Sequence, residues 1–357
     1  MTVRWRWTTS GFPGSPPSGR HRTLPATVAT FNPVDVLHAP LLPQPPAVPA
    51  PLLDALAPRS ALQGYLDTVI AVGAPEYTTA SLVLQGDQVV AEAYRDGLGS
   101  ESPLKGFSMS KSFANLLVGR LAARGVVAVD DALLLPGWDQ DQRSLVTWDR
   151  SLRMSSGLRW HEAALGPDND QGQMFYNTAD PAAYAASKPL EVAPYSRFNY
   201  SSGDYMNVAS ALVRVPHWFD PGWDLGGPFS LEFAPDGGVP LLAEGVYLTT
   251  RGWAGMARLY MNGGRLGEQQ ILPDQWVTYS LTPSDTNYDY GAGLWLNRGQ
   301  NLFPDLPPDV FAFIGSYDRY VVAVPAEDVV VVRFGFSHQP GDFDMERFVL
   351  NVLELVP

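Results

Sequence analysis

The feature that most constrains the fold is the position of the strand-like segments, which lie near the two ends of the chain. Residues 81–84 and 89–94 flank the turn Gln85-Gly86-Asp87 and predict a β-hairpin. Val-rich runs at 320–324 and 329–334 predict a second strand pair. An apolar sheet face must be covered by another layer, so we expect one antiparallel sheet built from both ends of the chain.

The rest of the chain shows mainly helical spacing of apolar residues. This pattern predicts an α+β fold in which an antiparallel sheet is flanked by terminal helices and carries an inserted helical lobe. The lobe would follow the first strands and precede the last ones. Helices are expected at 62–72, 108–125, 145–154, 180–187, 249–260, from 271 onward and at 343–355, with further strands at 288–296 and 310–314.

The domain organisation follows from a change in composition near residue 58. Residues 1–57 are rich in proline and predict an extended N-terminal tail. Residues 58–357 predict a single domain, with a sheet region formed by 58–105 and 285–357 and a mainly helical lobe at 106–284. The tail lacks the apolar run of a secretory signal, which favours a cytoplasmic location. The sequence leaves the oligomeric state open.

Composition and charge limit the possible partners and cofactors. The formal net charge of -13 argues against nucleic acid or an anionic membrane as a partner. The chain has no cysteine, and its 5 histidines lack zinc-site spacing, so we expect neither a metal nor a cofactor. A small molecule is the expected substrate, because the charge inside a cleft can differ in sign from the net charge.

A Ser-x-x-Lys pair, Ser108 and Lys111, stands at the predicted start of a long helix. Residues i and i+3 share a helix face, so a hydroxyl and an amine can meet there. A buried lysine with a lowered pKa can take the proton from a serine, which arginine cannot do. Lysine is scarce, and the others are Lys105 and Lys188. The pair Ser102/Lys105 lies among Pro and Gly, where residues i and i+3 need not face each other, and we discard it.

The segment Gly106-Phe-Ser-Met-Ser-Lys-Ser-Phe113 resembles the active-site motif of the penicillin-recognising serine hydrolases, which include serine β-lactamases, DD-peptidases and related esterases. Further segments resemble that family's landmarks in the same order, over roughly residues 58–357. They are Leu152-Arg-Met-Ser-Ser-Gly157, Arg197-Phe-Asn-Tyr-Ser-Ser202, Glu244-Gly-Val-Tyr-Leu-Thr-Thr-Arg251, Leu259-Tyr-Met-Asn-Gly-Gly264 and Gly315-Ser316.

The resemblance implies a role for several of these residues. Ser108 would be the nucleophile and Lys111 its base, and Tyr200 would take the place of the family's catalytic tyrosine, which passes a proton to the leaving group. Taken alone, Tyr200 could equally be a core tyrosine at a turn. The backbone N–H groups of Ser108 and Ser316 would form the oxyanion hole.

Two departures favour the branch of esterases and 6-aminohexanoate-dimer (nylon-oligomer) hydrolases over β-lactamases. Ile314 precedes Gly315 in the region of the Lys-Thr-Gly motif, where it cannot grip a substrate carboxylate as the family's basic residue does. Ser202 stands where many β-lactamases carry Asn, although it could merely cap the following helix. We expect Ser202, Gly315 and Ile314 to contact substrate.

Residues 160–176 fall where the family's substrate-facing loop should lie. Trp160, Asp170 and Tyr176 are therefore candidate substrate contacts, and Asp168 or Asp170 could bind a substrate ammonium group. A solvated acidic loop is the competing interpretation. Residues 213–245 look shorter than the family pattern, as if a helix were lost.

The expected function is a serine hydrolase that cleaves ester or amide bonds of small molecules through an acyl-enzyme on Ser108. The alternatives are a β-lactamase or DD-peptidase, a penicillin-binding sensor that acylates without turnover, and an inactive pseudo-enzyme. The shortened 213–245 segment is the main support for the inactive form.

Overall fold

The computed structural model describes residues 61–71, 76–162, 169–219, 225–235, 238–337 and 341–357. The chain divides into two units, Met1–Pro49 and Ala50–Pro357, and every described residue belongs to the second unit. The predicted tail 1–57 lies outside the described residues, so its boundary at residue 58 stays a prediction. None of the described helices is long and apolar enough to cross a membrane.

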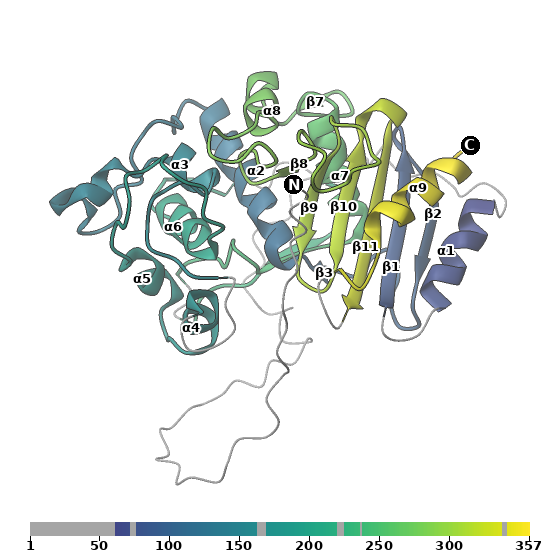
Figure 1. The fold of residues 1–357 in the computed structure, drawn as a ribbon, viewed down its shortest axis with the longest axis horizontal. Coiled ribbons are helices and arrows are strands. Elements are labelled where there is room, and N and C mark those ends of the chain that lie inside the picture. Colours follow the sequence, from purple (N-terminus) through teal and green to yellow (C-terminus); the bar gives the residue numbers. More distant parts are fainter. Residues whose placement is uncertain (1–60, 72–75, 163–168, 220–224, 236–237, 338–340) are drawn as a thin grey trace, which may run out of the picture. The chain divides into compact units, whose positions relative to one another are not determined.

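The central element is a six-stranded antiparallel sheet with the order β2-β1-β11-β10-β9-β8 in the described part of the chain. Strand β1 pairs with β11 along its length, so segments about 250 residues apart lie side by side (Figure 1). The sheet is therefore built from both ends of the chain, as predicted. The strands are β1 (Glu76–Gln85), β2 (Gln88–Tyr94), β8 (Trp295–Leu296), β9 (Phe311–Gly315), β10 (Arg319–Val324) and β11 (Val329–Ser337).

Both faces of this sheet are buried, which explains the unbroken Val run of β11. Val329 and Val331 pack in a cluster with residues of α1 (Ala61–Ala71) and α9 (Met345–Leu355), the terminal helices. Val330 and Val332 pack in the larger cluster on the other face, where α7 (Thr250–Met261) lies (Figure 1). Successive side chains alternate across a strand, so only an all-apolar strand fills both layers.

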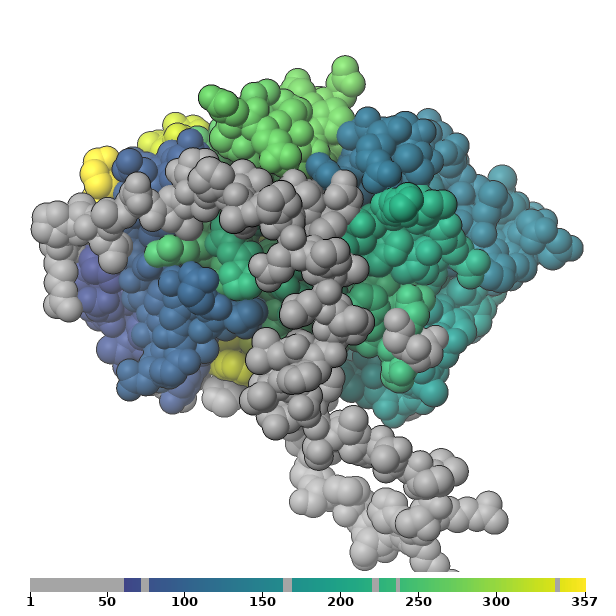
Figure 2. Space-filling view, turned by 180° about the vertical axis from the view of Figure 1, so that it is seen from behind, coloured from purple at the N-terminus to yellow at the C-terminus, as the bar shows by residue number. Residues whose placement is uncertain are grey.

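The helical lobe is inserted between β2 and β8. In the rear view of Figure 2, blue and teal residues of the lobe lie on one side and the purple and blue residues of α1, β1 and β2 on the other. The lobe helices are α2 (Ser110–Ala123), α3 (Trp148–Leu152), α4 (Asp170–Tyr176), α5 (Pro181–Ala186), α6 (Ser202–Leu212) and α8 (Asp274–Ser280). Short 3₁₀ turns occur at Phe107–Met109, Trp138–Gln140, Gln142–Leu145 and Pro325–Glu327.

Three parts of the predicted pattern were wrong. A helix, α4, begins at Asp170 inside the expected loop, because the side chain of Asn169 accepts a hydrogen bond from the Gly172 N–H and caps it. Most of the strand expected at 288–296 consists of turns and bends. Only β8 is a strand, after the positive φ of Gly293, and Tyr290 forms an isolated bridge with Trp295. Small sheets were missed: β3 (Leu104–Lys105) with β5 (Val246–Leu248) and β4 (Phe229–Leu231), and β6 (Arg265–Leu266) with β7 (Gln269–Gln270).

The end of β9 and the turn before α2 are held together by a close backbone approach. A Cβ atom on Gly315 would lie 2.2 Å from the carbonyl oxygen of Gly106. A Cβ atom on Gly106 would lie 2.3 Å from the ring of Trp253 in α7. Phe107, next in the chain, has a φ of 47°, which is strained for a residue with a side chain. Glycine is thus required at both positions to bring this turn against the sheet.

We predict that Gly315→Ala destabilises the protein by roughly 1–3 kcal/mol, since backbone must move to admit the methyl group. The midpoint of urea unfolding measures this change. Gly99→Ala is the matched control, because a Cβ atom there meets nothing within 4 Å. Equal midpoints for the two variants would contradict the close approach.

Candidate active site

The side chains of Ser108 and Lys111 meet, as their spacing predicts. Ser108 lies in the 3₁₀ turn and Lys111 in the first turn of α2, and the Lys111 Nζ donates a hydrogen bond to the Ser108 Oγ at 2.9 Å. Lys111 is only 1% exposed, whereas Ser108 is partly exposed. A buried amine beside a reachable hydroxyl is the arrangement that serine activation by lysine requires.

The amine of Lys111 has two further acceptors, and each comes from a distant segment. Its Nζ donates to the Ser202 Oγ at 3.1 Å and to the carbonyl oxygen of Ala243 at 3.0 Å. An ammonium group has three N–H donors, and here each has one acceptor. The observed contacts therefore match the charged form of Lys111.

Glu162 joins this group, although the sequence analysis did not single it out. Its carboxylate accepts hydrogen bonds from the Ser202 Oγ at 2.7 Å and from the Ser202 backbone N–H at 2.6 Å. The indole Nε1 of Trp160 donates to the same carboxylate at 2.7 Å. Glu162 and Ser202 are 40 positions apart, so no local motif could have revealed the pair.

Tyr200 approaches Lys111 with the face of its ring. The Lys111 Nζ lies 5.0 Å from the ring centroid, within the range of a cation–π contact. The ring stacks on Trp295 at a centroid distance of 5.7 Å. Within the described residues the phenol has no hydrogen-bond partner, which leaves it available to a bound molecule. Its role as proton donor stays a prediction.

The candidate oxyanion hole lies where β9 ends. Gly315 faces the turn before α2, because a Cβ atom there would contact both Gly106 and the side chain of Met109. Ser316 follows directly and is exposed. The backbone of Ser316 thus comes close to the turn that carries Ser108, and its N–H group remains the predicted partner of the Ser108 N–H.

Ile314, a predicted substrate contact, points away from this site. Its side chain packs against the cluster beneath α1 and α9, while Phe313 and Gly315 face the other layer. Alternation along β9 requires this arrangement. The geometry therefore does not support a direct contact between Ile314 and a molecule bound at Ser108.

Asp170 was predicted to bind a substrate ammonium group, but its partner is an ammonium group of the chain. Its carboxylate forms an ion pair with Lys188, accepts from the Tyr184 hydroxyl at 2.7 Å and from the His161 N–H at 2.8 Å. Burial opposes its ionisation, yet these hydrogen bonds hold the pKa of Asp170 below its usual value. These contacts favour a structural role, joining α4 to α5. Asp168 lies outside the described residues.

The two aromatic candidates differ in accessibility. Trp160 is 3% exposed, and a Cβ atom on Gly203 would lie 2.6 Å from its ring, so it packs beneath the start of α6. It reaches the site through its hydrogen bond to Glu162 rather than by facing solvent. Tyr176, at the end of α4, is 77% exposed. Desolvation, followed by the charge of Glu244, raises the pKa of its phenol.

The pair Ser102/Lys105 does not form a second site. The Lys105 Nζ makes an ion pair with Glu232 at 2.6 Å and lies 3.7 Å from Glu244. The Ser102 Oγ instead accepts from the Gly99 N–H at 3.0 Å. The two side chains thus have different partners. Lys105 lies in strand β3 rather than in the expected loop, and in a strand residues i and i+3 point to opposite faces.

A basic side chain does lie close to Gly315, which the sequence analysis overlooked. Arg319 pairs with Gly315 in the β9–β10 register and is 7% exposed. Its guanidinium donates to the Lys105 carbonyl and lies 4.6 Å from the Phe107 ring centroid. Burial lowers the pKa of Arg319 to about 10. Its contacts make it a support for the nucleophile turn.

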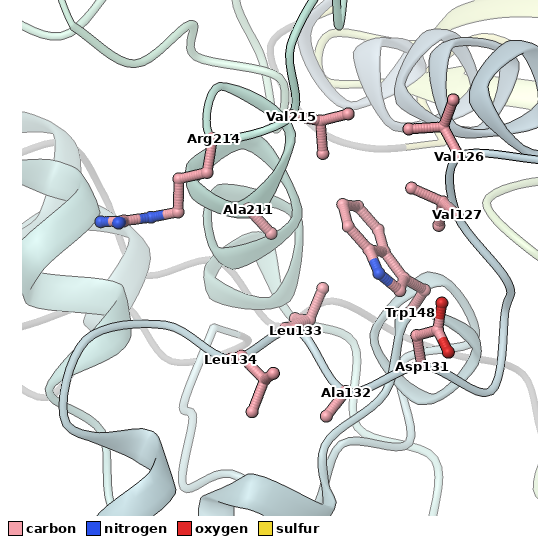
Figure 3. Close-up of a pocket in the computed structure, with 10 residues that line it drawn as sticks. All are labelled: Val126, Val127, Asp131, Ala132, Leu133, Leu134, Trp148, Ala211, Arg214 and Val215. Atoms are coloured by element: carbon pink, nitrogen blue, oxygen red, sulfur yellow. The ribbon is translucent and has the colours of Figure 1, made fainter.

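A cavity of about 450 Å³ lies elsewhere in the lobe, between α6 and the segment 126–134. Trp148 and aliphatic side chains line it, and Figure 3 shows the Arg214 guanidinium directed away from the tryptophan. None of the candidate site residues lines this cavity. Elsewhere, no three His, Cys, Asp or Glu side chains of the described residues are grouped as metal ligands would be.

The segment that carries most of the candidate site matches a known protein family. Residues 76–221 match the family model described as Beta-lactamase, and this segment carries Ser108, Lys111, Tyr200 and Ser202. The resemblance predicted from the motifs is thereby confirmed. A search of curated protein sequences returned no match.

Solved structures share the fold at low sequence identity. A putative 6-aminohexanoate-dimer hydrolase from Bacillus anthracis is 17% identical, with a TM-score of 0.61 and 77% of each chain covered. A putative β-lactamase from Bacteroides dorei is 17% identical, with a TM-score of 0.62 over 82% of this chain and 98% of that one. A family VIII carboxylesterase is 13% identical, with a TM-score of 0.62 over 85% and 98% of the two chains. The fold is β-lactamase-like, as predicted.

The buried carboxyl of Asp204 in α6 should make the stability of the protein depend on pH. Burial raises the pKa of its carboxyl to about 8, although the Ser156 hydroxyl donates to it at 2.7 Å. Because the pKa of Asp204 is higher in the folded than in the unfolded chain, its protonation stabilises the folded state. This stabilisation is fully present below the unfolded-state pKa of 3.8 and is lost as the pH rises to about 8. Asp204→Asn keeps an acceptor for Ser156 without the ionisation.

We therefore expect the free energy of unfolding of wild type to fall relative to Asp204→Asn between pH 4 and about 8. Urea unfolding midpoints across that range measure the difference. Parallel curves for the two proteins would show that Asp204 does not titrate in this way.

Proposed function

We propose that this chain, whose residues 76–221 match the Beta-lactamase family model, hydrolyses ester or amide bonds of small molecules through an acyl-enzyme on Ser108. The observation that carries the proposal is the hydrogen bond between the buried Lys111 amine and the partly exposed Ser108 hydroxyl. The contacts of Lys111 with Ser202 and Ala243 hold the amine at that position.

The reaction follows from these positions. Lys111, once neutral, accepts the Ser108 proton as the Ser108 Oγ attacks the substrate carbonyl carbon. The backbone N–H groups of Ser108 and Ser316 stabilise the oxyanion. Tyr200 protonates the leaving alcohol or amine and becomes a phenolate. The phenolate then takes a proton from a water molecule as that water attacks the ester on Ser108. The acid is released, and the Ser108 Oγ recovers its proton from Lys111. Each step uses groups of this chain and water.

The substrate class follows the branch indicated by the sequence, the esterases and 6-aminohexanoate-dimer hydrolases. The absence of a basic residue at Phe313–Ile314 and the backbone contact of Arg319 both disfavour a carboxylate clamp of the β-lactamase kind. A small neutral ester or amide is the proposed substrate, and the cytoplasm the proposed location.

We predict that Ser108→Ala and Lys111→Ala each reduce p-nitrophenyl ester hydrolysis by at least about 10³-fold, because one removes the nucleophile and the other its base. Initial rates, corrected for the spontaneous hydrolysis of the ester, measure this loss. Ser102→Ala is the matched control, since it alters the neighbouring Ser-x-x-Lys and should retain full activity. Unchanged hydrolysis in Ser108→Ala would refute the proposal.

The alternatives differ in what remains bound to Ser108. Intact-mass measurement after a fluorophosphonate should show one adduct in wild type and none in Ser108→Ala. A pseudo-enzyme forms no adduct, a sensor keeps a permanent penicillin adduct, and a β-lactamase turns over nitrocefin.

We predict that Tyr200→Phe lowers kcat by about 10²-fold or more while leaving the unfolding midpoint close to that of wild type. The phenol is the proposed acid, whereas the ring that stacks on Trp295 is retained. Steady-state kinetics with an amide substrate measure the change. A kcat equal to that of wild type would remove Tyr200 from the mechanism.

A further inference from the structure

Lys111 must lose a proton before it can act as the base proposed above. All three N–H donors have acceptors, and one of those acceptors is the Ser108 oxygen itself. Three oxygen acceptors around the amine fit an ammonium group, which has no lone pair to offer Ser108. We take charged Lys111 as the starting state, and a second group must then receive a proton.

The hydrogen bonds lead from Lys111 to one carboxylate. The Ser202 hydroxyl has a single proton, and because an ionised carboxylate only accepts, that proton is directed to Glu162. The lone pairs of the Ser202 oxygen then face the Lys111 Nζ at 3.1 Å. Lys111, Ser202 and Glu162 thus form a hydrogen-bonded chain, in which Lys111 donates to Ser202 and Ser202 donates to Glu162.

We propose that Glu162 serves as the proton acceptor for Lys111 through the Ser202 hydroxyl, which deepens and rests on the function proposed above. Lys111 gives one N–H proton to the Ser202 oxygen while the Ser202 O–H proton passes to Glu162. Ser202 ends as it began, Lys111 becomes a neutral amine, and Glu162 becomes a carboxylic acid. Atoms and charge balance without any other reactant.

Other groups near Lys111 are less suited to this role. The carbonyl oxygen of Ala243 is not a base, and the Tyr200 phenol makes no hydrogen bond to Lys111 within the described structure. Glu244 is 7% exposed, but its charge is shared with Lys105 at 3.7 Å, and it forms no direct bond to Lys111 among the described contacts. Asp204 is held by Ser156.

The position of Glu162 is fixed from two sides. The Ser202 N–H and the Trp160 indole both donate to its Oε2 atom, which leaves Oε1 for the Ser202 hydroxyl. Trp160 in turn packs against Gly203 at the start of α6. A carboxylate held this firmly keeps the Ser202 hydroxyl in one orientation.

The test is the pH dependence of kcat/KM for p-nitrophenyl ester hydrolysis in wild type and Glu162→Gln. In wild type the proton moves within the protein, so the profile should be flat across neutral pH. In Glu162→Gln the Lys111 proton must leave to solvent, so kcat/KM should rise about tenfold per pH unit. At neutral pH the loss should be about 10²-fold, since one positioned proton transfer is removed.

Two further variants separate this role from simple structural support. Ser202→Ala breaks the same chain, so it should show the same sloping profile even if Glu162→Gln folds poorly. Glu232→Gln is the matched control, because that carboxylate pairs with Lys105 and its profile should remain flat. Glu162→Asp keeps an acceptor and should recover part of the neutral-pH activity.

The outcomes distinguish the two proposals. A flat profile in folded Glu162→Gln or Ser202→Ala, in an otherwise active enzyme, would overturn the relay and leave the hydrolase intact. The relay would also be overturned if Glu162→Gln acylated Ser108 at the wild-type rate and then accumulated the acyl-enzyme. Glu162 would in that case act when water attacks the acyl-enzyme. Wild type without fluorophosphonate adduct or turnover would overturn the hydrolase itself.

Discussion

The buried amine of Lys111 is the interaction on which the candidate site depends. An ammonium group without partners in a protein interior costs several kcal/mol, so its acceptors must be in place whenever the chain is folded. They come from the turn before α2, the start of α6 and the residue before Glu244. Satisfying one side chain therefore requires segments more than 130 positions apart to converge, and this convergence assembles the site.

Much of the fold could be predicted because its strands and helices have a strong period. The hairpin β1–β2, the pair β10–β11 and helices α2, α7 and α9 were all expected, although β1 begins five residues before the predicted start at Ser81. The sheet β3-β5-β4 was not, since strands of two or three residues are too short to show alternation. Helix α4 was missed because Gly and Asp around residue 170 look like a loop, while an Asn169 cap decides the outcome.

The sequence indicated candidate site residues in two ways, through close spacing and through an ordered resemblance to a family. Ser108 and Lys111 meet because helix geometry dictates it, and Tyr200 and Ser202 were expected from an ordered resemblance. Glu162 gave no signal, since its partner Ser202 is 40 positions away. Ile314 and Asp170 were assigned by alignment and composition, but strand alternation turns the first away and Lys188 neutralises the second.

One contact of Lys111 leaves no trace in the sequence. Its third acceptor is the main-chain oxygen of Ala243, which any amino acid at that position would supply. Substitution at 243 can therefore alter the packing of this fully buried residue without deleting the acceptor, and the identity of its side chain gives no sign of the contact. A site search based on residue identity would find Ser108, Lys111 and Ser202, yet overlook the peptide group that completes the shell around the amine.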